Sequence, residues 1–281
     1  MPELPEVETV MRGMDEVLTG RRIISVNQRR KDLRVPFPKD LKSSLEGALI
    51  RDMKRRAKYI VMNLDNDLSV ILHLGMSGRI NLSEDADSYQ IQKHDHLILI
   101  LDDGSLMSFN DARRFGMVMI SNQNNIESHP SFKKLGPEPF DNKFSAPVLY
   151  DSLKEKKTTF KAALMDQRIV AGLGNIYVCE SLFYAGIDPQ RLCRSITKNE
   201  SELLVKAIRD VLQKAIEAGG STLKDFRHAD GELGYFQHNF AVYDREGETC
   251  PECNCELNKT GGVKKMTQNG RSTYYCSVKQ G

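Results

Sequence analysis

The sequence predicts an α+β protein built as an N-terminal β-sandwich with a leading helix, a helical region and a small C-terminal β-ribbon. Three observations predict this order. Apolar residues recur at helical spacing near the N-terminus, then in short strand-like runs, and then again at helical spacing. A Gly-Pro-rich break over residues 135–139 separates the strand-rich part from the helical part. Four of the six cysteines lie beyond residue 249, which marks off the ribbon.

The leading helix is predicted over residues 5–19, because its apolar side chains fall on one face. Pro5 suits a first helical turn, and Gly20 suits the end of the helix. From residue 21 to about residue 120, short apolar runs alternate with turn residues such as those at 102–104. Many short strands with turns between them are typical of a β-sandwich or barrel.

Helical periodicity returns in four segments, over residues 145–156, 159–168, 175–185 and 198–218. The following glycine-rich segment, 219–237, is a long polar loop, and loops of this length are often functional. Residues 240–281 are predicted to form the ribbon. We therefore expect three domains, over residues 1–136, 137–239 and 240–281.

The composition excludes several classes of protein. With 40% hydrophobic and 28% charged residues, the chain is neither collagen-like nor a long disordered segment. No apolar run approaches the roughly 18 residues of a membrane helix. No export signal is visible, so we expect no membrane association and a cytoplasmic protein. The net charge is only +2, but basic residues cluster over 21–34 and 51–58. Such clusters suit a polyanion, although they are also common on solvated surfaces.

The N-terminal residues offer an unusual nucleophile. Removal of Met1 would expose the secondary amine of Pro2, and α-amines titrate near pH ~8. A neutral amine attacks electrophilic carbon and forms a Schiff base. Glu3 and Glu6 lie beside it in the sequence and could move protons. The simpler alternative is that Pro and Glu here only begin a helix.

Five further motifs offer chemistry, and each also has a purely structural interpretation. They contain Lys58 in 55–59, Met76 in 73–78, His94 in 93–96, Arg113 and Phe115 in 110–116, and Asn175 in 172–177. A Phe next to two Arg residues suits insertion into a base stack, but it also fits a strand edge. An Asn at a helix start suits phosphate binding, but it also fits a helix cap.

The cysteines indicate a metal site. Cys250, Cys253, Cys255 and Cys276 crowd one short region of a chain without an export signal, which favours metal binding over disulfides. Cys179 and Cys193 stand alone in helical sequence and are predicted to be buried apolar residues.

Together and in this order, these motifs resemble the formamidopyrimidine-DNA glycosylase family. The resemblance extends over essentially the whole chain. It is carried by residues 1–10, 55–59, 73–78, 93–96, 111–116, 135–139, 174–177, 219–226, 234–236 and 270–276. Leu4 and Val7 favour this branch over the sister endonuclease VIII branch.

The resemblance implies a β-sandwich, a helix-two-turn-helix domain and a zinc finger. It implies a monomeric bacterial enzyme of base excision repair, found in the cytoplasm and acting on double-stranded DNA with oxidised bases or abasic sites. The enzyme would flip out 8-oxoguanine or a formamidopyrimidine. Pro2 would attack the sugar C1′, Glu3 would shuttle protons, and β- and δ-elimination would remove the sugar.

The resemblance also implies roles for further residues. Lys58 and Arg271 would contact phosphates and assist catalysis, and residues 219–236 would close over the damaged base. Met76, Arg113 and Phe115 would fill the gap left by the flipped nucleotide. The implied DNA contacts are His94, Arg113, Lys156, Asn175 and Tyr177.

One feature departs from the family pattern of two Cys-x2-Cys pairs. Cys250 and Cys253 form the first pair, but Lys279 stands where the fourth cysteine belongs. We expect one structural zinc ion, with Cys255 as the candidate replacement ligand; a hairpin without metal is the alternative.

Three other functions stay open at the level of sequence. They are an endonuclease VIII-like glycosylase for oxidised pyrimidines, a non-catalytic lesion-binding relative, and a zinc-ribbon interaction protein.

Overall fold

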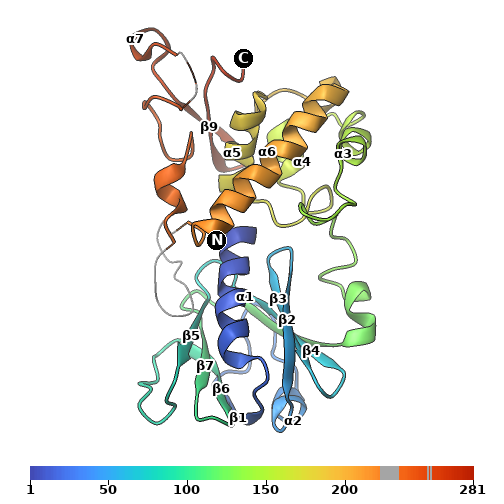
Figure 1. Cartoon of the computed structure of the whole chain (residues 1–281), viewed down its shortest axis with the longest axis vertical. Helices are drawn as coiled ribbons and strands as arrows, with labels where there is room; N and C mark the ends of the chain where they lie inside the picture. The colour runs from blue at the N-terminus through green and yellow to red at the C-terminus, as the bar shows by residue number, and fades with distance from the viewer. Residues whose placement is uncertain (222–233, 252, 254) are drawn as a thin grey trace. The chain divides into compact units, whose positions relative to one another are not determined.

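The computed structural model describes residues 1–221, 234–251, 253 and 255–281 (Figure 1). The chain divides into two compact units, residues 1–133 with 218–235 and residues 134–217 with 236–281. The helical region and the C-terminal ribbon, expected as separate domains, thus share one unit. No helix among the described residues is long and apolar enough to cross a membrane.

The first unit is an antiparallel β-sandwich with a leading helix. One sheet has the order β1-β6-β7-β5, and the other has the order β2-β3-β4-β8. The strands of the first sheet are β1 (Ile23–Gln28), β5 (Arg79–Ser83), β6 (Asp95–Leu101) and β7 (Leu106–Asn110). Those of the second are β2 (Ile50–Arg56), β3 (Tyr59–Leu64), β4 (Leu68–His73) and β8 (Met117–Asn122). Two short helices, α2 (Leu41–Leu45) and the 3-10 helix η1 (Gln123–Ser128), complete this unit.

Helix α1 (Leu4–Leu18) packs on the sandwich and contacts strands of both sheets (Figure 1). Val7, Val10 and Met14 are buried, as the helical spacing of apolar residues predicts. Burying one such side chain contributes about 1.5–3 kcal/mol. This packing holds the beginning of the chain at a fixed place on the first unit.

The β2–β3 hairpin places Lys58 at the end of strand β4. The two-residue turn consists of Ala57 and Lys58, and Ala57 has a left-handed φ of 53°. Tyr59 then pairs with His73, the last residue of β4. A non-glycine residue in the left-handed region is uncommon and marks a turn whose geometry is imposed by its surroundings.

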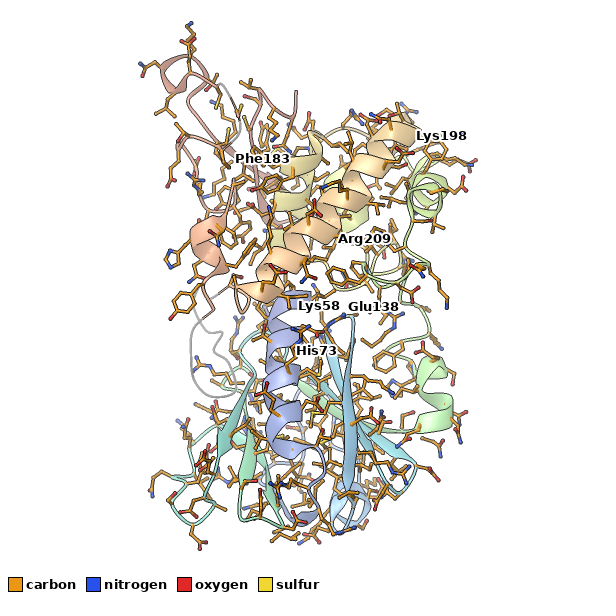
Figure 2. The ribbon with its side chains drawn as sticks, viewed as in Figure 1. Lys58, His73, Glu138, Phe183, Lys198 and Arg209 are labelled. Atoms are coloured by element: carbon orange, nitrogen blue, oxygen red, sulfur yellow. The ribbon has the colours of Figure 1, made fainter. Side chains whose placement is uncertain are left out.

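The second unit combines helices with a β-hairpin. Its helices are α3 (Ala146–Leu153), α4 (Phe160–Leu164), α5 (Asn175–Ala185), α6 (Lys198–Glu217) and α7 (Leu257–Thr260), with 3-10 helices η2 (Cys193–Ser195) and η3 (Phe236–Asn239). The Arg209 guanidinium on α6, labelled in Figure 2, donates to the carbonyls of Pro139 and Phe144. It thereby attaches the segment that follows the Gly-Pro-rich break to α6.

The hairpin consists of β9 (Lys264–Gln268) and β10 (Arg271–Tyr275). Its turn residues, Asn269 and Gly270, have φ values of 50° and 71°. Positive φ at both central positions defines a type I′ turn, for which Asn-Gly is the preferred sequence. Arg271 is therefore the first residue after a tight turn, and its side chain is exposed.

Candidate functional site

The N-terminal turn of α1 brings three predicted catalytic residues together. Pro2, Glu3 and Glu6 are all buried, whereas Met1 is exposed. The Glu3 backbone N–H donates to Glu6 Oε2 at 2.8 Å, as in a capping box. The helix-capping alternative is therefore realised in the structure. The same hydrogen bonds fix the carboxylates of Glu3 and Glu6 at the start of the helix that Pro2 precedes, so capping does not exclude a chemical role.

Glu6 also contacts the stem of the glycine-rich segment. Its Oε1 accepts the Ser221 backbone N–H at 2.9 Å and the Ser221 hydroxyl at 3.0 Å. Tyr235 N–H donates to the Ala218 carbonyl at 3.0 Å, which closes the stem. The expected lesion-capping loop over 219–236 lies largely outside the described residues, since 222–233 are not described.

Lys58 precedes β3 and His73 ends β4, so both lie at the same end of the two inner strands of the second sheet (Figure 2). Burial, with the positive charges of Lys58 and Arg34, lowers the pKa of His73 to about 4. His73 is therefore neutral at pH 7, and its Nδ1 accepts the Gly75 N–H at 3.1 Å. The Lys58 ammonium is largely buried, so it is positioned by the fold rather than free to sample solvent.

The turn that carries Lys58 is held by an ion pair. Arg55 Nε lies 2.8 Å from Glu8 Oε2 on α1, and both side chains are largely buried. Arg55 also donates to the Ala57 carbonyl at 3.1 Å. The pair therefore connects helix α1, which begins at the Pro2 turn, to the Lys58 turn.

Met76, Arg113 and Phe115 lie on two turns that a single buried carboxylate joins. Asp111 Oδ1 accepts the Ser77 hydroxyl at 2.6 Å and the Arg113 N–H at 3.2 Å. Met76 is 38% exposed and Phe115 is 43% exposed, so both large apolar side chains reach solvent. The Arg113 guanidinium lies 5.1 Å from the centre of the Phe115 ring. The structure thus presents two apolar side chains and a cation together.

The Met76 turn requires glycine. Gly75 has a φ of +64°, and a Cβ built on it would lie 2.6 Å from the Gly116 nitrogen. Any side chain at this position would separate the two turns. Glycine at position 75 therefore allows the backbone next to Met76 to lie directly against the backbone of Phe115 and Gly116.

A basic cavity of about 390 Å³ lies on the first unit. It is lined by Arg29, Arg30, Lys93, His94, Asp95, His96, Ala112 and Arg114. The one acid, Asp95, already accepts from the Gln92 N–H and the Asn110 amide. The cavity is therefore cationic and suits a phosphate group, and it contains the predicted contact His94.

In the second unit, the structure brings Asn175 to the hairpin that carries Arg271. Asn175 is the first residue of α5, and its Nδ2 donates to the Ser272 carbonyl at 2.9 Å. Among the described residues, its buried Oδ1 has no hydrogen-bond partner. The two predicted phosphate contacts of this unit thus lie on elements joined directly by a hydrogen bond.

Two further predicted contacts differ in their exposure. Lys156 is half-buried in the turn after α3. Tyr177 is fully buried, and its ring lies 5.9 Å from that of Phe236. The Tyr177 ring thus has no exposed surface, and its contact with DNA stays a prediction. Tyr177 belongs to α5, the helix whose first residue is Asn175.

The comparisons with known proteins agree with one family. Residues 1–118 match the model of the formamidopyrimidine-DNA glycosylase N-terminal domain, and residues 135–227 match its H2TH domain. The formamidopyrimidine-DNA glycosylase of Rhodospirillum rubrum is 47% identical over 280 residues, with 100% of each chain covered. That of a Ruegeria species is 49% identical, with 98% of each chain covered. This chain belongs to the formamidopyrimidine-DNA glycosylase family.

Solved structures support the same family. A complex of a Lactococcus lactis formamidopyrimidine-DNA glycosylase mutant with DNA containing Fapy-dG has a TM-score of 0.89, 34% identity and 99% coverage of each chain. The Thermus thermophilus protein has a TM-score of 0.86 and 36% identity, covering 99% of this chain and 98% of that one. The predicted α+β architecture is therefore confirmed.

The C-terminal cysteines of this chain form a compact cluster. The four sulfur atoms of Cys250, Cys253, Cys255 and Cys276 all lie within 4.8 Å of one another. Cys250 and Cys255 are 3.3 Å apart, and Cys253 and Cys276 are 3.7 Å apart. Four sulfurs bound tetrahedrally at about 2.3 Å would lie about 3.8 Å apart, so the donor set fits a metal such as zinc.

Lys279 is not part of this cluster. Its Nζ lies 4.6 Å from the centre of the Phe183 ring, in a cation–π contact. The interpretation that Lys279 replaces one of the four cysteines is therefore not supported: Cys255, the candidate replacement ligand, supplies the fourth sulfur. The sequence signal for this was the additional cysteine two residues after Cys253.

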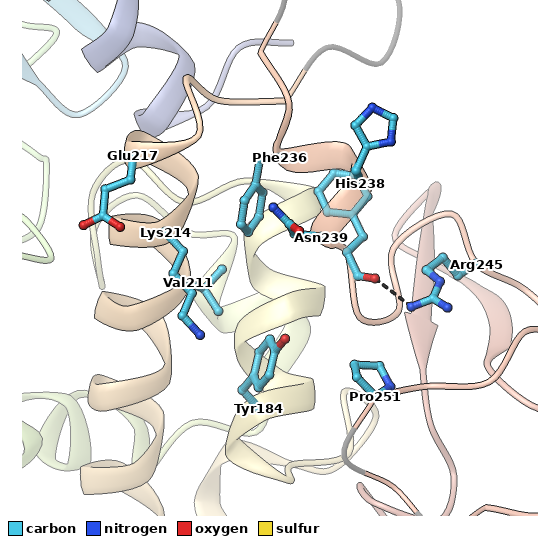
Figure 3. Close-up of a pocket in the computed structure, with 10 residues that line it drawn as sticks. Tyr184, Val211, Lys214, Glu217, Phe236, His238, Asn239, Arg245 and Pro251 are labelled. Carbon is cyan, nitrogen blue, oxygen red and sulfur yellow. Dashed lines mark hydrogen bonds between the residues drawn. The ribbon is translucent and has the colours of Figure 1, made fainter.

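A larger cavity of about 550 Å³ lies between α6 and residues 236–251 in the second unit (Figure 3). Tyr184, Phe236 and Phe240 provide its aromatic surface. Arg245 is held there by the Phe240 carbonyl, to which it donates at 2.8 Å. None of its ten lining residues is a predicted catalytic, DNA-contacting or metal residue.

Proposed function

We propose that this protein removes oxidised purines from double-stranded DNA and then cleaves the strand at the abasic site. Relatives at 47–49% identity over nearly their whole length are formamidopyrimidine-DNA glycosylases. Solved structures similar over 99% of the chain are complexes with DNA containing Fapy-dG or an abasic site. The observation that carries the proposal is the start of α1, where buried Pro2 directly precedes Glu3, and the Glu3 N–H donates to the buried Glu6 carboxylate.

The chemistry begins with the Pro2 nitrogen, which removal of Met1 exposes. The nitrogen lone pair attacks the sugar C1′, the bond from C1′ to the base breaks, and the departing base takes up the proton that the Pro2 nitrogen loses. Glu3 supplies the proton that opens the sugar ring, which leaves an iminium ion between Pro2 and C1′. The iminium acidifies the neighbouring C2′–H, so β-elimination and then δ-elimination release the two phosphate ends of the strand.

Access to C1′ requires the nucleotide to leave the helix. Flipping costs a few kcal/mol of stacking and pairing. Met76 and Phe115 are exposed and held close to Arg113, so they suit insertion into the gap. Lys58 and Arg271 supply cations for the phosphates on either side, and the cavity around His94 suits another phosphate.

We further propose that the cluster holds one zinc ion through Cys250, Cys253, Cys255 and Cys276. The ion would be structural, because four thiolates leave no open coordination position for a water molecule. It would stabilise the part of the chain that carries Arg271. We propose in addition that the protein acts as a monomer in the cytoplasm of a bacterium.

The test is a strand-cleavage assay on matched duplexes containing 8-oxoguanine opposite cytosine, or thymine glycol. The proposal expects faster cleavage of the 8-oxoguanine duplex, with products of β,δ-elimination, and loss of cleavage in Glu3→Gln. Preferential cleavage of thymine glycol would indicate the endonuclease VIII-like alternative. Binding to both duplexes without cleavage would indicate a non-catalytic relative.

A further inference from the structure

A lysine is buried where three elements of the second unit meet. Lys161, on α4, is only 2% exposed. Its Nζ lies 3.1 Å from Cys179 Sγ on α5 and 3.1 Å from Thr273 Oγ1 on β10. Both partners are themselves almost completely buried. One ammonium therefore connects α4, α5 and the hairpin.

Placing an ammonium here costs free energy, because a buried charge loses its hydration. Among the described residues, its hydrogen-bond partners are a thiol and a hydroxyl, and both compensate less than a carboxylate does. Burial raises the pKa of the Cys179 thiol, although the charge of Lys161 opposes this, so the thiol stays protonated at pH 7. The neighbouring acid, Glu180, directs its oxygens at the backbone N–H groups of residues 241–243. Apolar side chains could pack these elements together without the free-energy cost of burying a charge. The lysine therefore contributes what apolar packing does not, namely two directional hydrogen bonds that fix how the elements are placed.

The positions of its two partners define that role. Thr273 follows Arg271 by two residues on β10 and lies next to Ser272, whose carbonyl accepts from Asn175 Nδ2. Cys179 follows Asn175 by four residues, about one helical turn along α5. Lys161 therefore donates hydrogen bonds to α5 and to β10, in each case close to the residue that is expected to contact phosphate, Asn175 on α5 and Arg271 on β10.

We infer that Lys161 is a positioning residue that fixes Arg271 relative to Asn175, so that both reach the phosphates of one DNA strand. The Lys161 ammonium and the Asn175 amide hold adjacent residues of β10, namely Thr273 and Ser272. Two attachments at adjacent residues restrain both the sliding of β10 along α5 and its turning about its own axis. This inference rests on the proposed function, because it assigns the pair a phosphate-binding role.

The first test uses variants that keep the shape of the core. Thr273→Val is isosteric and suits a strand, but it removes the hydroxyl; Thr273→Ser keeps the hydroxyl and serves as the matched control. Lys161→Met keeps the length of the side chain and removes the ammonium. We expect Thr273→Val and Lys161→Met to raise KM for an abasic-site duplex about tenfold, which corresponds to about 1.4 kcal/mol. Both should also reduce the share of δ-elimination product, while Thr273→Ser stays within about twofold of the unsubstituted protein.

The second test separates positioning from general stability by a double-mutant cycle with Arg271→Ala. If Lys161 acts through Arg271, Lys161→Met has little further effect on KM once Arg271 is absent. Equal effects of Lys161→Met in both backgrounds would overturn the inference, as would an unchanged KM and product ratio in Thr273→Val. Failure of the unsubstituted protein to cleave the abasic duplex would instead contradict the proposed function.

Discussion

Glu6 and Ser221, which are 215 positions apart in the chain, share two hydrogen bonds to one carboxylate oxygen. The other oxygen of Glu6 accepts the Glu3 N–H at the start of α1. A Cβ on Gly220 would lie 3.1 Å from Glu6 Cγ, so glycine permits this close approach. The carboxylate therefore connects the Pro2 turn to the stem of the glycine-rich segment.

Substitution of Glu6 should destabilise the first unit and slow the chemistry. Glu6→Ala removes the acceptor of the Glu3 N–H and of the Ser221 N–H and hydroxyl, and a hydrogen bond to a charged group contributes about 1.5–3 kcal/mol. Glu6→Gln should have a smaller effect, because its amide oxygen still accepts from Ser221. Thermal unfolding and single-turnover base excision measure the two effects. A Glu6→Ala protein with unchanged melting and excision would contradict this account.

Loss of the Asp111 carboxylate should weaken binding to lesion-containing DNA. Asp111→Ala frees the turns that carry Met76 and Phe115, because Oδ2 also accepts the Gly116 N–H at 2.7 Å. We expect about tenfold weaker binding, measured by fluorescence anisotropy on a duplex with an abasic analogue. The control is Asp103→Ala, since Asp103 also caps a turn by accepting from Ser105. Equal losses in both variants would exclude a specific role for Asp111.

The stability of the first unit should fall as the pH decreases from about 6.5 towards 4. The pKa of His73 is about 4 in the folded protein, below its ordinary value of 6.5, so the unfolded chain takes up the proton first. The stabilisation is complete above pH 6.5 and is lost as the pH falls towards 4. His73→Gln should show a shallower decrease in melting temperature over this window. Parallel curves for the two proteins would show that His73 does not titrate as the structure requires.

Elemental analysis should find one zinc ion per chain, and the variants should distinguish Cys255 from Lys279. Cys255→Ser removes one of the four sulfurs and should lower the zinc content well below one. Lys279→Met should retain the metal, because the lysine contacts Phe183 instead of the cluster. Full zinc content in Cys255→Ser would contradict the proposed set of ligands.

Local sequence signals predicted much of the fold. The predicted helix over 175–185 coincides with α5, and that over 198–218 ends one residue beyond α6. These segments combine helical spacing of apolar residues with strong boundaries, such as Gly186 in the left-handed region after α5. The Asn269-Gly270 pair likewise encodes its hairpin turn locally.

Contacts between distant residues could not be predicted in this way. Nothing near Glu6 indicates Ser221, and nothing near Lys161 indicates Thr273, because both pairings depend on how the whole unit packs. Tyr177 shows the same limit: its position in a recognised motif did not reveal that it is fully buried. The role of Asp111 was missed although it lies within the motif 110–116, since its partner turn lies more than 30 residues earlier.

The central claim is that the Pro2 nitrogen forms the bond to deoxyribose, and borohydride trapping tests it most directly. The protein is incubated with an 8-oxoguanine duplex and sodium borohydride, and the adduct is located by peptide mass mapping, with Pro2→Gly and Glu3→Gln as controls. The account predicts one adduct, on the N-terminal nitrogen of Pro2 after loss of Met1. An adduct on Lys58, or an undiminished yield of adduct in a chain that keeps Met1, would contradict it.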